Sequence, residues 1–392
     1  MNMPNAPRAG FYTEEGCDLS EFAALTSRNM TKTEVPQAIE IAKNIPIYDA
    51  ADLASTFGDQ QARRGLLAEW AYILKDAAGV FVIRHAQPDH AAIDAATEVF
   101  KQIIAAEKAS GASSADHFAA GQNDRVWNSL EKLCLADPAT FIRYHASPAI
   151  DAASEAWLGP NYQMTAQINL VYPGGAPQQP HRDYHLGFQT AEMCATYPVH
   201  VHDLSPLMTL QGGLAHCDMS VESGPTQLLP FSQMYGPGYA AYRRDDFRAH
   251  FEAHAVQLPL AKGDALFFNP ALFHAAGENR TTDVDRLVNL FQVSSAFGRS
   301  LERVDRTAMC KALYDPLLAA HAAADVSELG RKAVIASSAE GYSFPTNLDT
   351  DPPVGGLAPE TQAALLARHL ETGSPLAVFE KDLAALDARK LG

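Results

Sequence analysis

The chain has 392 residues, of which 47% are apolar and 19% are charged, so a large core can form and wholesale disorder is not expected. Its formal net charge of −16 argues against nucleic acid or an anionic membrane as the main partner, because both select clustered Lys and Arg. The five scattered cysteines include no C-x-x-C pair, which fits a reducing compartment. Met1 to Gly16 lacks an apolar signal core, and no run reaches the roughly 18 apolar residues of a membrane span. We therefore expect a cytoplasmic protein.

The first 158 residues are expected to be mainly helical. Apolar residues at helical spacing, among them Trp70 and Leu74, predict a helix over 62–77. The run Val-Phe-Val-Ile predicts a strand over 79–84, and a small polar stretch predicts a loop over 111–124. Further helices are expected over 18–26, 90–107, 125–135 and 138–158.

After residue 159 the pattern changes to that of strands. Polar Gln167 and Asn169 alternate with apolar Ile168 and Leu170, which predicts a strand with one polar face. A polar face that points inward indicates a barrel with a wet centre, and many short strands separated by turn signals are typical of a barrel or jelly roll. The remaining expected strands are 207–210, 214–218, 227–229, 255–260, 265–268 and 287–294, with Gly212-Gly213 as the turn between the first two.

The last part of the chain returns to helical patterns, expected over 301–324, 327–337, 359–371 and 376–391. These helices are most simply packing or dimer elements, so a homodimer through the helical extensions is one expectation. The Tyr-rich stretch 234–247 contains Arg243-Arg244. It is interpreted as a surface helix whose basic pair is offset by Asp245-Asp246, with a lid over a pocket as the alternative.

His181-x-Asp183 is the motif that carries chemistry. Residues i and i+2 of an extended segment project to the same face, so both side chains can reach one metal ion. An imidazole and a carboxylate are two of the three ligands in the two-histidine, one-carboxylate set that holds non-haem Fe(II) with open coordination positions. The third ligand has to come from elsewhere in the chain, and His274 is the candidate. His216-x-Asp218 is a rival pair, and His200-x-His202 is a third, which we interpret as part of a surface loop.

The neighbourhood of this motif shows an ordered set of signals. A polar-faced strand and a Pro-Gly turn precede Gln178-Gln179-Pro180-His181-Arg182-Asp183. Glu222-Ser223-Gly224-Pro225-Thr226, Gly263-Asp264 with its apolar run, His274 and finally Arg286 follow. This order resembles the phytanoyl-CoA hydroxylase (PhyH) family of Fe(II)/2-oxoglutarate-dependent oxygenases.

The resemblance implies a role for each of seven residues. His181, Asp183 and His274 would bind Fe(II), and Arg286 would pair with the far carboxylate of 2-oxoglutarate, since guanidinium binds carboxylate in a two-pronged geometry. Asn169 would be a weaker cosubstrate contact, while Gln167 and Thr226 would contact the substrate.

Two departures concern the cosubstrate contacts. Ala276 stands where the family often has Ser or Thr, and Arg280 remains an alternative to Arg286 because it is nearer to His274 in the chain.

We therefore expect an α+β protein with a double-stranded β-helix core, a jelly-roll or cupin-like barrel, and helical additions at both ends. One catalytic domain would span 1–392, with a mainly helical part over 1–158, the core over 159–300 and a helical extension over 301–392. The function implied is a dioxygenase that uses Fe(II), 2-oxoglutarate and O2 to hydroxylate an aliphatic C–H bond of a small molecule, with succinate and CO2 as co-products. The alternatives are a cupin-like metalloenzyme that does not use 2-oxoglutarate and a non-catalytic small-molecule-binding barrel.

Overall fold

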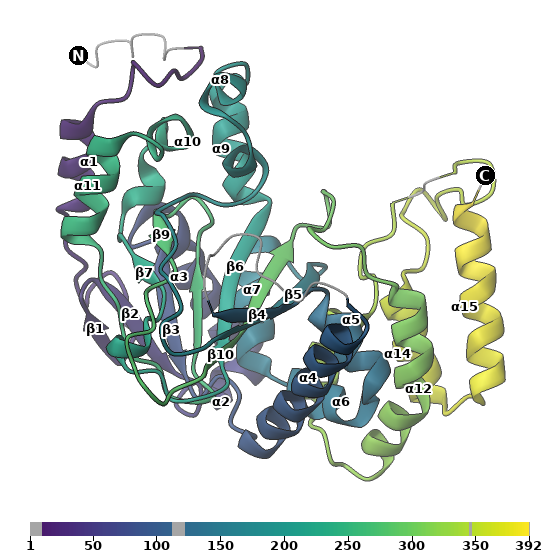
Figure 1. Ribbon diagram of the computed structural model, residues 1–392. Helices are drawn as coiled ribbons and strands as arrows, with labels where there is room; N and C mark the ends of the chain where they lie inside the picture. Colours follow the sequence, from purple (N-terminus) through teal and green to yellow (C-terminus); the bar gives the residue numbers. More distant parts are fainter. Residues whose placement is uncertain (1–9, 112–121, 345–346, 392) are drawn as a thin grey trace.

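The structure is a computed structural model that describes residues 10–111, 122–344 and 347–391. Within these residues, one large mixed sheet occupies the centre of the molecule and helices cover it (Figure 1). The helices between residues 90 and 145 lie beside the C-terminal helices on the right of the view, whereas the first helix of the chain lies on the left. The protein is thus α+β, and the arrangement is consistent with the expected double-stranded β-helix.

The large sheet has eight strands among the described residues. All neighbouring strands are antiparallel except β2 and β3, which are parallel. In spatial order the strands are β1 (Glu40–Ala42), β2 (Ile45–Asp49), β3 (Val80–Arg84), β8 (Ala265–Phe268), β6 (Thr209–Ala215), β10 (Arg286–Ser294), β5 (Gln163–Val171) and β4 (Asn123–Val126).

A second, smaller sheet pairs β7 (Gln227–Leu228) with β9 (His274–Ala275). Single bridges extend it, from His181 to His274 and from Leu228 to Val256. The stretch 255–260 makes only such bridges, so the strand predicted there is wrong.

The helices bury their apolar faces on the large sheet and on one another. On α3, Trp70 stacks on Phe81 of β3 with ring centroids 4.9 Å apart, and both side chains are fully buried. The helices are α1 (Leu19–Thr26), α2 (Ala54–Gly58), α3 (Gln60–Asp76), α4 (His90–Ala109), α5 (Ser129–Ala136), α6 (Pro138–His145), α7 (Pro148–Leu158), α8 (Ala191–Cys194), α9 (Val199–Leu207), α10 (Gly238–Ala241), α11 (Asp245–His254), α12 (Arg306–Ala322), α13 (Glu328–Ser338), α14 (Gln362–Thr372) and α15 (Leu376–Lys390).

The C-terminal helices share the core of the rest of the chain. Tyr314 of α12 stacks on Phe379 of α15 at 4.4 Å, and α12 also packs on α5 and α6. The prediction that these helices form a homodimer remains untested. None of the described helices is long and apolar enough to cross a membrane.

Two predicted helices are corrected, one by strand pairing and one by local backbone chemistry. The expected helix over 125–135 starts only at Ser129, because 123–126 pair with β5 as strand β4, with Arg125 opposite Asn169. Of the rest of the loop predicted over 111–124, Gly111 and Gln122 lie outside helices and strands, and 112–121 are outside the described residues. The expected helix over 138–158 is two helices, because Pro148 disfavours helical backbone in the residue before it and Ser147 caps the second helix.

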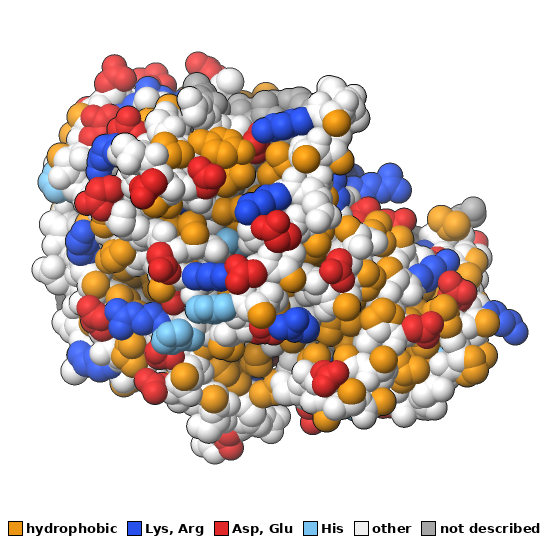
Figure 2. Space-filling view, turned by 60° about the horizontal axis from the view of Figure 1, so that its bottom comes forward, with side chains coloured by type: hydrophobic (Ala, Val, Ile, Leu, Met, Phe, Trp, Pro, Cys, Tyr) orange, Lys and Arg blue, Asp and Glu red, His pale blue; other side chains and the backbone are white. Residues whose placement is uncertain are grey.

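The predicted turn at Gly212-Gly213 is also wrong, since 209–215 form the single strand β6. Gly212 is needed for close packing: a Cβ there would lie 2.7 Å from the Phe267 ring on β8. On the face of the molecule shown in Figure 2, acidic and basic side chains are interspersed and do not gather into a patch of one sign.

Candidate metal centre

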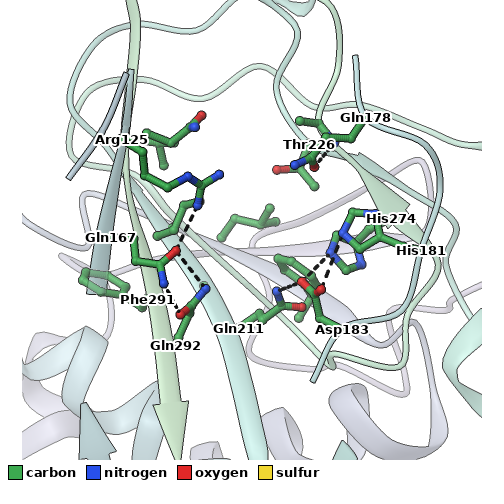
Figure 3. Close-up of a pocket in the computed structure, with 18 of the residues that line it drawn as sticks. Arg125, Gln167, Gln178, His181, Asp183, Gln211, Thr226, His274, Phe291 and Gln292 are labelled. Atoms are coloured by element: carbon green, nitrogen blue, oxygen red, sulfur yellow. Dashed lines mark hydrogen bonds and ion pairs between the residues drawn. The ribbon is translucent and has the colours of Figure 1, made fainter. Parts of the chain in front are cut away.

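His181, Asp183 and His274 converge at one point of the structure. One ligand atom of each lies within 4.8 Å of the others. The Nε2 atom of His274 is 3.3 Å from Oδ2 of Asp183, and Nε2 of His181 is 3.6 Å from Oδ1 (Figure 3). Backbone bonds fix the convergence, because His181 and His274 each donate an N–H to the other's carbonyl, at 3.0 and 3.2 Å.

The orientation of both imidazole rings is set by the backbone. Nδ1 of His181 lies 2.7 Å from the carbonyl oxygen of Gln179, and Nδ1 of His274 lies 2.9 Å from that of Leu272. A carbonyl only accepts, so Nδ1 carries the proton and Nε2 keeps its lone pair on the side of Asp183. The three residues therefore fit a divalent metal of the two-histidine, one-carboxylate type, which leaves one face of the metal open.

The charges of the group favour an ionised carboxylate. Burial opposes ionisation, but His181 and then His274 hold the pKa of Asp183 well below its usual range. Burial and the neighbouring His181 lower the pKa of His274. A neutral His274 and an anionic Asp183 are the protonation states that metal ligands need. Burial opposes a charge on His181, but Asp183 raises its pKa, so metal binding would displace a proton from its Nε2.

Gln211 is a contact of this group that the sequence analysis did not identify. It lies on β6, and its Nε2 donates a short hydrogen bond to Oδ2 of Asp183. A signal existed in the sequence: Gln211 is the one amide in the otherwise small or apolar run Thr209–Ala215. We infer that Gln211 orients the carboxylate.

A cavity of about 690 Å³ adjoins the three residues. Its lining includes all seven residues singled out from the sequence: His181, Asp183, His274, Arg286, Asn169, Gln167 and Thr226. The alternation of β5 explains part of this, since Gln167 and Asn169 share the inward face. The structure thus brings the seven residues together, while their individual roles remain predictions.

Arg286 is a buried cation at the start of β10, with 4% of its surface exposed. Its Nη1 donates to the carbonyl oxygens of Ser223 and Gly277, at 2.9 and 3.1 Å. Within the described residues no acidic side chain forms an ion pair with it. Burial lowers the pKa of Arg286 to about 10, which leaves it charged at neutral pH. The rival Arg280 is exposed and lies outside the cavity.

The rival histidine pairs have other partners. Both ring nitrogens of His216 are bonded, Nε2 to the Tyr144 hydroxyl at 2.6 Å and Nδ1 to the Thr97 hydroxyl at 2.8 Å. His202 was expected on a surface loop, but it is buried on α9, where its Nε2 contacts the Cys194 carbonyl oxygen. The stretch Val199–Leu207 is thus a helix and not a surface loop, and neither pair belongs to the metal-ligand group.

The stretch 234–247 is buried more deeply than a surface helix. Tyr235 and Tyr242 are at most 5% exposed and belong to a core cluster that also contains Phe22 of α1. Arg244 pairs with Asp246 at 2.6 Å, as the interpretation of an offset basic pair requires. Neither Arg243 nor Arg244 lines the cavity.

Comparison with known proteins places this site in context. A family model described as Phytanoyl-CoA dioxygenase (PhyH) matches residues 71–288, more than half of the chain. Dioxygenase trt7 of Aspergillus terreus is 26% identical over 162 residues, which are 41% of this chain and 50% of that protein. Uncharacterized protein YJR154W of Saccharomyces cerevisiae is 29% identical over 130 residues, 33% of this chain and 34% of that protein. The matches therefore span a half or less of these curated relatives.

Among solved structures, the non-heme alpha ketoglutarate dependent epimerase SnoN from nogalamycin biosynthesis is 20% identical, with a TM-score of 0.42. The similarity covers 59% of this chain and 82% of SnoN. AviO1 from Streptomyces viridochromogenes Tue57 is 17% identical over 58% of this chain and 94% of its own, also with a TM-score of 0.42.

Proposed function

The chain belongs to the phytanoyl-CoA dioxygenase (PhyH) family, and on that basis we propose that it hydroxylates an aliphatic C–H bond of a small molecule. Its cofactor is Fe(II) and its cosubstrates are 2-oxoglutarate and O2, in keeping with the family and with the His-Asp-His group. Succinate and CO2 would be the co-products. The observation that carries the proposal is the convergence of His181, Asp183 and His274 beside a cavity that also contains a buried arginine.

The proposed roles follow from the contacts. His181 and His274 would offer Nε2 lone pairs, and Asp183 one carboxylate oxygen, which leaves coordination positions for 2-oxoglutarate and O2. When bound, iron with these cosubstrates supplies the oxidant that removes hydrogen from carbon. Arg286 would pair with the far carboxylate of 2-oxoglutarate. Phe268, whose ring centroid is 4.7 Å from that of His274, would exclude water on that side.

The burial of Arg286 helps to distinguish the oxygenase from the two alternative functions. A buried guanidinium without an acidic partner among the described residues is costly unless an anion binds it. A metalloenzyme that does not use 2-oxoglutarate, or a barrel that only binds a small molecule, has no need of this cation. The dicarboxylate accounts for it, which favours the oxygenase.

The test measures succinate and CO2 from labelled 2-oxoglutarate in the presence of Fe(II) and a library of candidate substrates. We expect product formation in the unmodified protein, with one oxygen atom of labelled O2 in the product. Each of the variants His181→Ala, Asp183→Ala and His274→Ala should lose this turnover and also lose Mn(II) binding, with folding retained. The exposed His200→Ala is the matched control. Turnover that survives in the three variants would exclude the proposed ligand set.

A further inference from the structure

The cavity has a polar wall on the side opposite the metal ligands. Arg125 of β4, Gln167 of β5 and Gln292 of β10 lie there, across the cavity from His181 and His274 (Figure 3). Glu302, which follows β10 in the chain, also lines the cavity. We call these four residues the distal wall. Strand register brings three of them to one face, since Arg125 lies opposite Asn169 and Gln292 lies opposite Thr165.

Three residues of the distal wall are hydrogen-bonded to one another. Nη1 of Arg125 donates to Oε1 of Gln167 at 2.9 Å, and Nε2 of Gln167 donates to Oε1 of Gln292 at the same distance. The Arg125 guanidinium also lies 5.0 Å from the ring centroid of Trp127. Arg125 and Gln167 are at most 4% exposed. These contacts fix the orientation of the groups before any ligand binds.

Glu302 leaves one hydrogen-bond acceptor unused. Its Oε1 accepts from the backbone N–H of Asn128 at 2.7 Å, whereas Oε2 is buried and has no partner in the part of the chain that the structure describes. Burial raises the pKa of Glu302, against the opposing effects of the Asn128 N–H, Gln167, Lys132 and Arg125. A buried, unsatisfied carboxylate oxygen is rare, and a donor on a ligand would satisfy it.

The charges of the distal wall select against ions of either sign. A carboxylate that approached Arg125 would also face Glu302, and an ammonium that approached Glu302 would also face Arg125. Like charges at short range are costly where water is scarce. Arg182 also lines the cavity, but its guanidinium donates to the carbonyl oxygens of Ser232 and Tyr235. A neutral hydroxyl, amide or carbonyl avoids both repulsions, and hydroxyls and amides donate as well as accept.

The remaining lining of the cavity includes apolar side chains. Val288 and Leu290 line it from the same face of β10 as Gln292, and Phe188 and Leu301 also border the cavity while 49% and 38% exposed. We propose that the substrate is a neutral molecule with an apolar body and a hydroxyl, amide or carbonyl head, and that the head binds the distal wall. This inference rests on the proposed function for one point, that the oxidised carbon lies on the metal side.

Three probes with one scaffold test the charge selection. Cyclohexanecarboxamide, cyclohexanecarboxylate and cyclohexylmethylammonium share a ring and differ in the charge of the head. Their dissociation constants are measured at neutral pH by ligand-observed NMR with protein loaded with Zn(II) and 2-oxoglutarate, so that Asp183 and Arg286 of the same cavity are occupied and no turnover takes place. We expect the carboxamide to bind about tenfold more tightly than either ion. Either ion would leave one polar group of the distal wall without a matching partner, and the carboxamide would not. Equal or tighter binding of an ion, or no binding of the carboxamide, would overturn the proposal.

Two isosteric variants should change the selection in opposite directions. Glu302→Gln removes the negative charge, so the carboxylate should gain affinity relative to the carboxamide. Gln292→Glu adds a negative charge, so the ammonium should gain. Exposed Glu98→Gln on α4 is the control and should change neither ratio. Unchanged ratios in both folded variants would show that the distal wall does not bind the head. Normal probe selection in a protein that forms no succinate would instead count against the proposed function alone.

Discussion

At the scale of single residues, Gln211 is the side chain that we infer holds the metal-binding carboxylate of Asp183 in its orientation. Its Nε2 bonds Oδ2 of Asp183, while Oε1 has no partner among the described residues, so the amide has one productive orientation. A partner of this kind holds a ligand in its binding geometry.

We therefore expect Gln211→Leu to weaken Mn(II) or Co(II) binding to the folded protein by about 10–100-fold. Titration calorimetry or the Mn(II) EPR signal measures the affinity. Gln292→Leu is the matched control, because Gln292 is the register neighbour of Gln211 on β10 but does not bond Asp183. Equal metal affinities in the two variants would remove the positioning role.

Arg286 and Arg280 differ in burial, and the difference predicts which one binds 2-oxoglutarate. Arg286→Ala removes a buried cation that lines the cavity, so 2-oxoglutarate binding should weaken by about 2–4 kcal/mol. Arg280→Ala changes an exposed side chain outside the cavity and should have little effect. Binding is measured by titrating 2-oxoglutarate into the Mn(II)-loaded protein. A larger effect of Arg280→Ala would reverse the assignment.

At the scale of elements, the long alternating strands could be predicted, and among the short ones β7 and β8 were predicted while β1 and β9 were not. β5 and β10 each have nine residues, which is enough for a polar and an apolar face to show in the sequence. β1 and β9 have three and two residues and no measurable period. β4 was missed because its partner strand, and not its own pattern, makes it extended.

The residues of the candidate site likewise divide into those that a local sequence pattern reveals and those that only the assembled fold brings to the site. The spacing of His181 and Asp183 is local and visible in the sequence, whereas their approach to His274 depends on a backbone bridge between distant segments. The order of motifs in the family supplied that third residue. Gln211, Arg125 and Gln292 reach the cavity only through strand register, and register is set by the assembled sheet.

Replacing Gly212 of β6 should lower stability, because the residue packs closely against β8. A Cβ on Gly212 would lie 2.7 Å from the Phe267 ring and 3.1 Å from the carbonyl oxygen of Leu266. Gly212→Ala should therefore lower the free energy of unfolding by about 1–3 kcal/mol. Gly65→Ala is the opposite case, since nothing lies within 4 Å and the residue is inside α3, so it should raise stability by about 0.5–1 kcal/mol. Urea unfolding measures both, and a gain from Gly212→Ala would contradict the packing argument.

At the scale of the whole molecule, one hydrophobic cluster joins parts that are far apart in sequence. It includes Trp70 of α3, Phe267 of β8 and Phe379 of α15, so the helical additions and the strands share a core. That core also encloses titratable side chains. The free energy of unfolding of the protein should therefore depend on pH. The predicted division of the chain into parts 1–158, 159–300 and 301–392 stays a prediction.

His145 is the sharpest case of this dependence. It is fully enclosed on α6, its ring packs 4.3 Å from that of Phe141, and its Nε2 has no partner among the described residues. Burial lowers its pKa to about 3, below the value of about 6.5 in an unfolded chain. Between these values the unfolded state binds the extra proton. The stability that a neutral His145 contributes is therefore complete above pH of about 6.5 and is lost as the pH falls towards 3.

Replacing this ring isolates its contribution. His145→Phe should leave stability at pH 7 equal or higher, because it removes an unsatisfied nitrogen and keeps an aromatic ring. Below pH of about 6 it should make the fall in unfolding free energy shallower, by about 1.4 kcal/mol per pH unit. Urea unfolding of metal-free protein at a series of pH values measures the slope. The exposed His200→Gln should leave it unchanged. If His145→Phe kept the slope of the unmodified protein, the acid sensitivity would have to arise from other buried groups, such as His216, whose pKa burial likewise lowers to about 3.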